Sequence, residues 1–351
     1  MRRGAPRGRG TLHVKTEKFK GFCRAMDEMN WADTPIAQAA QRAAQVRGGR
    51  GLTLPKPDTV RTITVANQKG GVGKTTTSVN LAAALAVHGL KVLVVDLDPQ
   101  GNASTALSAE HRVGTISSYE MLIGECTAEE AMQQSPFSEN LFCIPATIDL
   151  AGSEIELVSM VRREYRLADA LNEKFIAKHG FDYIFVDCPP SLGLLTINAM
   201  TAVNEVLIPI QCEYYALEGV GQLLNNIDMI QRALNPQLHI SAILLTMYDA
   251  RTKLAEQVAE EVQGHFTNVV LKNIIPRSVK VSEAPGYGQT VLEYDPGSRG
   301  AMAYMEAAKE FANRGDAWMA PPEDTDEAGE PAAAESSDLP NQPSEQAEDE
   351  G

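Results

Sequence analysis

A glycine-rich turn between two regular patterns constrains this chain more than any other feature. Residues 61–67, RTITVAN, are short and largely apolar like a buried strand, and residues 75–88 have the pattern of a helix that ends at Gly89. The turn between them reads QKGGVGKTTT. Glycines let backbone N–H groups turn toward phosphate oxygens, and the start of the helix adds the positive end of its dipole. The pattern predicts a phosphate-binding loop.

The residue types in this loop indicate a nucleoside triphosphate bound with magnesium. Lys74 is placed to reach the β- and γ-phosphates, and the Thr75 hydroxyl is placed to ligate Mg²⁺. A glycine-rich turn with a chance lysine is the alternative, which the flanking strand and helix disfavour. The residues expected to contact the nucleotide phosphates are Gly70, Gly71, Val72, Gly73, Lys74, Thr75 and Thr76.

Two further segments supply carboxylates at the ends of apolar runs. Asp187 ends the run DYIFVD and is followed by CPPS, which suits a residue that holds Mg²⁺ through its waters. A strand-end Asp that only forms a turn is the alternative reading. In DLDPQGNAS, Asp96 and Asp98 form a second pair, and we assign Asp98 to orient the attacking water and to sense the γ-phosphate.

The apolar runs recur along the chain and alternate with helical patterns. Short, β-branched and nearly continuous runs are typical of strands buried on both faces. A capping box of Ser153 and Glu156 predicts the start of a long helix, and residues 214–234 predict another that ends before Pro236. The fold class predicted is α/β: a doubly wound, mainly parallel sheet flanked by helices. The expected strands are 61–67, 91–96, 182–187, 205–210 and 239–246.

Charge divides the 351 residues into three parts. The net charge is −15, but residues 321–351 hold 11 acidic residues and no Lys or Arg. Residues 1–59 hold 12 Lys or Arg against 5 Asp or Glu, which leaves the middle of the chain at about −11. We expect a disordered basic extension at 1–60 that contains one short helix at 33–46, a catalytic domain at 61–315, and a disordered acidic tail at 316–351. An over-extended start, with Met26 or Met29 nearer the true beginning, is the alternative for residues 1–25.

Cysteine usage and hydropathy restrict the compartment. The five cysteines are widely spaced and form no CxxC pair, so the sequence suggests neither a disulfide framework nor a zinc site. The basic start is not followed by an apolar signal region, and no apolar stretch approaches the ~18 residues of a membrane span. We therefore expect a cytoplasmic protein that does not enter membranes.

Four motifs together resemble one family. KGGVGKTTT, DLDPQGNAS, VDCPPSLG and IPRSVKVSEAPGYG occur in the order and approximate spacing of the ParA/Soj partitioning ATPases, in the deviant Walker A branch of P-loop NTPases that also contains MinD. The resemblance covers about residues 61–314 and is greatest to the chromosomal type. The usual GxxxxGK[ST] pattern fails because Gln68 stands at its first glycine, as is typical of this branch.

The resemblance implies an ATP-dependent, Mg²⁺-dependent homodimer that binds double-stranded DNA without sequence preference. It also implies slow hydrolysis, stimulated by a ParB-type centromere-binding partner, and association with the nucleoid. Lys69 then corresponds to the signature lysine, which contacts ATP bound by the other subunit. Two facing ATP molecules concentrate negative charge, so a cation supplied in trans stabilises both the dimer and the transition state. The alternative is a solvated loop lysine.

The same resemblance assigns other contacts. It places Pro276 beside the adenine and places DNA contacts at Arg251, Lys253, Arg277 and Lys280. Ordinary surface cations are the alternative for these four. The helix at 34–46 either docks a partner or covers the edge of the domain. The acidic tail is a solvated extension or a competitor of DNA for the basic residues.

Three other functions compete with partitioning. A MinD-like membrane-positioning ATPase should end in a basic amphipathic helix, whereas this sequence ends in acid. Metabolic members of the branch include cobyrinate- and biotin-pathway ligases and nitrogenase-like iron proteins, and the last of these need paired cluster cysteines. A non-enzymatic DNA-binding scaffold is disfavoured by the full set of Lys74, Thr75, Asp98 and Asp187.

Overall fold

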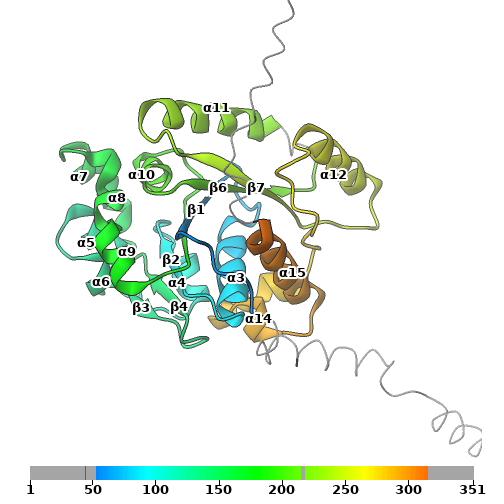
Figure 1. The fold of residues 1–351 in the computed structure, drawn as a ribbon, viewed down its shortest axis with the longest axis horizontal. Coiled ribbons are helices and arrows are strands. Elements are labelled where there is room, and N and C mark those ends of the chain that lie inside the picture. Colours follow the sequence, from blue (N-terminus) through cyan, green and yellow to red (C-terminus); the bar gives the residue numbers. More distant parts are fainter. Residues whose placement is uncertain (1–43, 45–52, 215–217, 315–351) are drawn as a thin grey trace, which may run out of the picture. The chain divides into compact units, whose positions relative to one another are not determined.

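The five predicted strands are adjacent in one sheet of the computed structural model (Figure 1). Each follows its sequence run within two residues, and their side chains are almost completely buried because helices cover both faces. The strands are β1 (Arg61–Val65), β2 (Val92–Asp96), β5 (Tyr183–Asp187), β6 (Glu205–Gln211) and β7 (His239–Thr246).

The structure describes residue 44 and residues 53–214 and 218–314. Of the predicted basic extension at 1–60 the structure describes residue 44 and residues 53–60, where Leu54 is buried and Lys56 pairs with Asp182; of the predicted helix at 33–46 only Ala44 is described, and it is helical, while the predicted acidic tail lies outside the described residues. Within the described ranges β1 begins at Arg61 and the last helix ends at Arg314.

The sheet has seven strands in the order β3-β4-β2-β5-β1-β6-β7. Neighbours pair in parallel except β3 (Gln133–Gln134), which runs antiparallel to β4 (Leu141–Ile144) at one edge. These two strands were not predicted, because each is short and β3 consists of two glutamines without an apolar pattern. Successive strands are added in two directions. From β1 the chain crosses β5 to form β2, and from β5 it later crosses β1 in the opposite direction to form β6. The direction in which strands are added therefore reverses beside β1. Ligands in open α/β sheets bind at such a reversal, outside the carboxyl ends of the strands.

Helices lie on both faces of the sheet. On one face α3, α14 and α15 pack together, and on the other α10 packs against α8 and α11 (Figure 1). Alternate residues of each strand enter the two cores: Tyr183 and Phe185 pack on the first face, and Ile184 and Val186 on the second. The helices are α3 (Lys74–Val87), α4 (Asn102–Ala106), α5 (Ser118–Ile123), α6 (Ala128–Ala131), α7 (Leu150–Val158), α8 (Arg166–Ala170), α9 (Glu173–His179), α10 (Leu194–Ala202), α11 (Glu218–Ala233), α12 (Lys253–His265), α13 (Val279–Glu283), α14 (Val291–Tyr294) and α15 (Arg299–Arg314).

One helix start was predicted wrongly. Ser153 and Glu156 form no capping box, because α7 begins earlier, at Leu150, and the Ser153 hydroxyl donates to the carbonyl of Leu150 at 2.7 Å inside the helix. Capping boxes occur instead at Ser117 with Glu120 and at Thr127 with Glu130. The end of α3 matches the prediction, since Gly89 follows it with φ of +84°.

Candidate nucleotide-binding site

The phosphate loop joins β1 to α3 and is shaped by its glycines. Gly71 and Gly73 have φ of +75° and +90°, values that side chains other than glycine rarely adopt. Gly73 is the N-cap of α3 and has no side-chain cap, so N–H groups at the start of this 14-residue helix remain available to an anion. The far side of the loop is fixed by Thr246 at the end of β7, whose hydroxyl donates to the Val72 carbonyl at 2.9 Å.

Lys74 lies inside the loop. Its side chain is buried, and its Nζ donates to the carbonyl of Lys69 at 3.3 Å, which closes the loop on itself. Burial lowers the pKa of Lys74, and the negative charges of Asp187 and Asp98 act in the opposite direction. The role of these carboxylates at a bound nucleotide stays a prediction.

Asp187 ends β5 in a fully buried position beside α3. The Ser78 hydroxyl donates to its Oδ1 at 2.8 Å, while Oδ2 has no hydrogen-bond partner within the described part of the chain. Burial and the neighbouring charge of Asp96 raise its pKa to about 7, and the Thr75 and Ser78 hydroxyls lower it. A buried carboxylate with an orphaned oxygen beside a threonine hydroxyl is the donor set that Mg²⁺ accepts. The residues present thus fit a magnesium ion held by Thr75 and Asp187.

The two carboxylates of the second pair, Asp96 and Asp98, are both buried but have different hydrogen-bond partners. Asp96 is fully buried and accepts hydrogen bonds from the backbone and hydroxyl of Ser104 at 2.8 and 2.7 Å and from the Asp98 N–H at 3.1 Å. Burial raises the pKa of Asp96 to about 6. Asp98 is 9% exposed, and its Oδ1 accepts the Gln100 N–H at 3.0 Å. Asp96 therefore holds the turn in place, and Asp98 lies almost buried at the start of the loop after β2, with one carboxylate oxygen held by the Gln100 N–H.

The side chain of Lys69 lies outside the phosphate loop, in which the side chain of Lys74 is buried. The backbone of Lys69 is fixed by an N–H bond to Asn67 Oδ1 at 3.0 Å, and Asn67 in turn donates to the Pro209 carbonyl at 2.8 Å. Its side chain is 37% exposed, and its Nζ lies 3.6 Å from Glu213 Oε2, just beyond β6. Gln211 also donates to Glu213. The two lysines of the loop thus face different surroundings.

Pro276 lies next to the extension of β7. Tyr248 pairs with Pro276 in a parallel bridge, with N–H bonds from Tyr248 to Ile275 and from Arg277 to Tyr248 at 3.0 and 2.9 Å. Thr246, two residues before Tyr248, contacts the phosphate loop. This segment is therefore close to the edge of the sheet at which the phosphate loop and the carboxyl ends of β2 and β5 lie, here called the nucleotide edge. Contact of Pro276 with the adenine stays a prediction.

The predicted DNA-contacting residues are all exposed. Arg251 makes two hydrogen bonds to Asp249, at 2.8 and 2.6 Å, and the charges of Arg251 and Arg277 help to lower the pKa of Asp249 to about 2. Lys280 pairs with Glu283 at 3.1 Å, and Lys253 begins α12. Arg251 thus pairs with Asp249, and Arg277 donates its backbone N–H to Tyr248, the residue before Asp249.

Comparison with known proteins identifies the family. A family model described as an AAA domain matches residues 60–240. Sporulation initiation inhibitor protein Soj of Bacillus subtilis is 53% identical over 253 residues, which cover 72% of this chain and 98% of Soj. Chromosome partitioning protein ParA of Caulobacter vibrioides is 48% identical over 255 residues, 73% of this chain and 95% of that protein. The chain belongs to the ParA/Soj family of partitioning ATPases.

Solved structures share this family's fold. Cobyrinic acid a,c-diamide synthase of Mycobacterium smegmatis, with bound ADP and magnesium, matches with a TM-score of 0.63 and 38% identity over 73% of this chain and 95% of that one. The cell division ATPase MinD of Pyrococcus furiosus matches with a TM-score of 0.60 and 28% identity over 73% and 99%. Within the described residues, no helix has the length and apolar character needed to cross a bilayer.

Three residues of this site were not predicted. Ser78 lies one helical turn beyond Lys74, so its spacing on α3 was a usable signal for a group that faces Asp187. Ser104 could not be linked to Asp96 by local spacing, because the contact depends on how α4 returns over the end of β2. Glu213 lies 144 residues from Lys69 along the chain, and only the pairing of β1 with β6 brings them together.

Proposed function

We propose that this chain is an ATP-driven partition switch: it binds ATP and Mg²⁺, forms a homodimer in the ATP state, binds double-stranded DNA without sequence preference, and segregates chromosomal or plasmid DNA. In this proposal a ParB-type partner stimulates its slow hydrolysis of ATP, and the ATP-bound form associates with the nucleoid. Support comes from the family, whose members include Soj and ParA proteins named for chromosome partitioning, and from the arrangement of the loop.

The observation that carries the proposal is the separation of the two loop lysines. Lys74 is buried in the phosphate loop, whereas Lys69 is 37% exposed and held at its rim by Glu213. One lysine can therefore neutralise the phosphates bound by its own subunit while the other remains accessible to a second subunit. A nucleotide switch that works as a monomer does not need the exposed Lys69.

The residues of the site divide the work of hydrolysis. Thr75 and Asp187 would hold Mg²⁺, which supplies charge neutralisation on the β- and γ-phosphate oxygens when it is bound. Lys74 and the N–H groups of the loop position the phosphates, and Asp98 orients the attacking water. Lys69 of the second subunit adds a positive charge beside the phosphate oxygens, where negative charge is concentrated in the transition state, and Lys69 reaches them only when its ion pair with Glu213 opens.

DNA binding is assigned to the basic surface formed by Arg251, Lys253, Arg277 and Lys280. These side chains are exposed on neighbouring segments after β7 and at α13, and none takes part in the core. Exposed cations that contact phosphates give affinity without base preference and a steep dependence on salt.

Co-sedimentation with plain duplex DNA tests the proposal. The protein is mixed with DNA without nucleotide, with ADP or with ATP, each with Mg²⁺, at low and at high salt. Binding should require ATP and should weaken steeply with salt. DNA binding that does not depend on the nucleotide, or no DNA binding under any condition, would rule out the proposed partitioning function.

The same experiment separates the competing functions. An arm with anionic vesicles in place of DNA tests the MinD-like alternative, which requires ATP-dependent binding to lipid. A metabolic ligase of the kind named in the cobyrinate-pathway structure should bind neither DNA nor vesicles while it still binds ATP.

A further inference from the structure

Helix α7 exposes large apolar side chains as well as burying them. On its inner side Leu150 and Leu157 are fully buried in the core, and the helix lies beside α5 and α10 (Figure 1). On its outer side Ile155 is 80% exposed and Val158 is 60% exposed. These two residues are three positions apart, so they are neighbours on the helix surface.

Helix α12 has the distribution that is usual for a helix on the surface of a monomer. Its side chains Val258 and Val262 are buried, and its exposed side carries Glu256, Glu260 and Glu261. Such a helix needs no further cover. The outer side of α7 instead leaves apolar side chains in water, which is typical of a surface that another molecule covers.

The exposed apolar side chains continue on both sides of α7. Ile148, just before the helix, is 57% exposed, and Val161, just beyond its end, is 85% exposed. We call these four residues the α7 apolar surface: Ile148, Ile155, Val158 and Val161.

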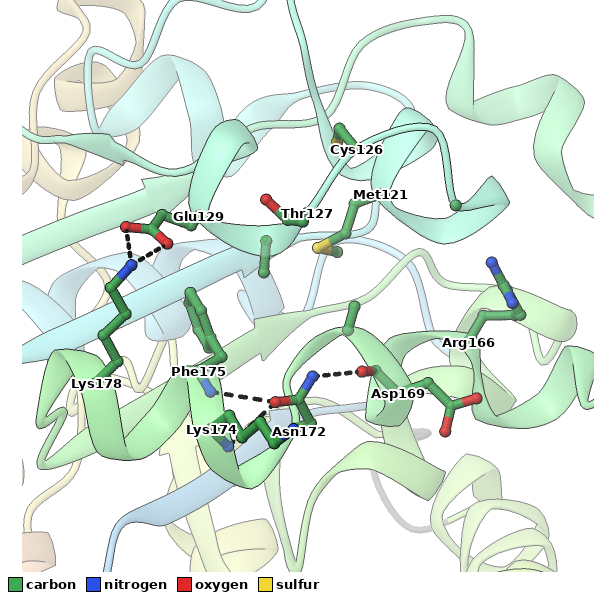
Figure 2. Close-up of a pocket in the computed structure, with 13 residues that line it drawn as sticks. Met121, Cys126, Thr127, Glu129, Arg166, Asp169, Asn172, Lys174, Phe175 and Lys178 are labelled. Atoms are coloured by element: carbon green, nitrogen blue, oxygen red, sulfur yellow. Dashed lines mark hydrogen bonds and ion pairs between the residues drawn. The ribbon is translucent and has the colours of Figure 1, made fainter.

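A cavity elsewhere in the chain shows how apolar groups are shielded without a partner. This cavity, of about 470 Å³, lies between α5 and α6 on one side and α8 and α9 on the other (Figure 2). The side chains of Met121 and Phe175 in its lining are buried, and two charged residues that also line it, Lys178 and Glu129, pair at 2.6 Å. No comparable cover exists for the α7 apolar surface within the described residues.

Helix α7 packs against the loop that follows Asp187. The Leu195 N–H, at the start of α10, lies 3.5 Å from Glu154 Oε1. Gly193, at the end of the loop, allows this approach, because a Cβ there would collide with the Glu154 carboxylate. One side of α7 is therefore in contact with a segment that begins at the nucleotide edge.

The start of the α7 apolar surface also adjoins the loop that follows Asp98. A hollow of about 570 Å³ is lined by Ile148 together with Gln100 and Gly101 of that loop. Strand β4, which precedes α7, runs parallel to β2, so its carboxyl end lies at the same edge of the sheet. The α7 apolar surface is thus continuous with the nucleotide edge.

Charge restricts the class of molecule that can cover this surface. Asp149 and Glu156 are exposed beside it, and Glu156 accepts a hydrogen bond from the Tyr119 hydroxyl at 2.9 Å. Arg162, which follows Val161, is paired with Asp169 at 2.9 Å. Exposed carboxylates repel both DNA and anionic lipid, so the surface fits another protein.

We propose that the α7 apolar surface is covered by a second copy of this chain in the ATP-bound dimer. This inference rests on the homodimer of the proposed function. In that dimer Lys69 reaches the nucleotide of the other subunit, so the two nucleotide edges face each other and a surface continuous with them meets the second copy. Two-fold symmetry buries the same apolar surface on both subunits, which supplies association free energy that the polar phosphate loop lacks.

Sedimentation velocity of the full chain tests the proposal, with ATP or ADP and Mg²⁺ at several protein concentrations. Ile155→Asp places a charge in the contact on both subunits and should weaken the ATP-dependent dimer at least about tenfold. Binding of a fluorescent ATP analogue to the monomer should not change. Met229→Asp is the matched control, because Met229 is 59% exposed near the end of α11, which leads to the start of β7 at the opposite edge of the sheet.

The outcomes separate this inference from the proposed function. If the unaltered chain forms no ATP-dependent dimer, both are wrong. If it does, and Ile155→Asp dimerises equally well or Met229→Asp causes the same loss, only the α7 contact is wrong.

Alkylation of a new cysteine gives a second measurement. Cys23 and Cys126 are first replaced by serine, and the cysteines at 143, 188 and 212 are buried. The alkylation rate of Ile155→Cys should then fall several-fold with ATP, and this protection should disappear on dilution of the protein. Met229→Cys should react at the same rate with ATP and with ADP. Protection of Ile155→Cys that appears only when a ParB-type protein is added would assign the surface to that partner and overturn the proposal.

Discussion

The nucleotide edge and the basic surface use charge in opposite ways. At the nucleotide edge Lys74, Asp96 and Asp187 are buried, and each is fixed by neighbouring hydrogen bonds. On the basic surface Arg251 and Lys280 are exposed, and each is paired with an acidic residue only two or three positions away. The charged groups of the first region are buried and held by hydrogen bonds, whereas the second keeps its cations in solvent.

This difference indicates what each region can do. Buried, oriented charges are worth most in a chemical step because no solvent has to reorganise around them. Exposed cations attract a polyanion such as DNA, and this attraction weakens as salt rises. Each cation contributes only a small part of the binding free energy. Substitutions should therefore have large effects at the nucleotide edge and small, additive effects on the basic surface, and Lys69 stands between the two extremes.

The largest effect is expected from Lys74→Ala. Removal of the buried ammonium leaves the phosphates without their nearest cation and should slow ATP hydrolysis by about 10³-fold or more. Single-turnover hydrolysis measures this effect, and thermal unfolding verifies that the variant is folded. A loss smaller than tenfold would show that Lys74 does not face the reacting phosphates.

Lys69→Ala should come next. Loss of a cation supplied in trans should abolish the ATP-dependent dimer at micromolar protein and slow hydrolysis by about 10²-fold, less than the loss of an arginine finger. Sedimentation velocity with ATP and with ADP measures the dimer. Lys309→Ala is the matched control, since that lysine also pairs with a glutamate, at 2.7 Å, away from the site. Normal dimers and normal hydrolysis in Lys69→Ala would contradict the role in trans.

Ser78→Ala tests the residue that sequence patterns missed. It removes one hydrogen bond to the buried Asp187 carboxylate, a loss of about 1.5 kcal/mol, and should slow hydrolysis roughly tenfold. Titration with Mg²⁺ at saturating ATP should show a weaker apparent affinity for the metal. Ser159→Ala, at an exposed helix end, should change neither value. Unchanged Mg²⁺ dependence would mean that Ser78 has no part in holding Asp187 for the metal.

Arg251→Ala should weaken DNA binding several-fold and lower the slope of log affinity against log salt by about one. Arg232 on α11 is a close control, because it too is exposed and pairs with an aspartate, at 2.9 Å compared with 2.6 Å for Arg251. Fluorescence anisotropy with duplex DNA and ATP at several salt concentrations gives both values. If Arg232→Ala has an equal effect, the attraction is diffuse and the basic surface has no special role.

The smallest effect is expected from Asp249→Asn. It frees Arg251 from its carboxylate and removes a negative charge near Arg277, so DNA binding should tighten by no more than a few-fold. Asp228→Asn, the equivalent change beside Arg232, should leave the affinity unchanged. Weaker DNA binding in Asp249→Asn would show instead that the carboxylate orients Arg251 for contact.

Much of the central fold could be predicted from the sequence because buried parallel strands have a strong local signal. All five predicted strands were found, and the glycine-rich turn lies between β1 and α3 as predicted. The short strands β3 and β4 and the true start of α7 were missed. Each depends on a neighbour rather than on its own pattern: β3 pairs with β4, and Ser153 turns inward to the carbonyl of Leu150.

The sequence by itself determined the chemistry of the loop. Glycines at 71 and 73 impose its backbone, and Lys74 and Thr75 follow directly on that backbone, so local geometry sets their positions. Only the tertiary structure decided which distant groups complete the site. Ser78 reaches Asp187, Ser104 fixes Asp96 and Glu213 holds Lys69 because the order of the strands brings the ends of β1, β2, β5 and β6 together. Contacts across such sequence distances arise from the packing of the whole sheet, and no local pattern encodes them.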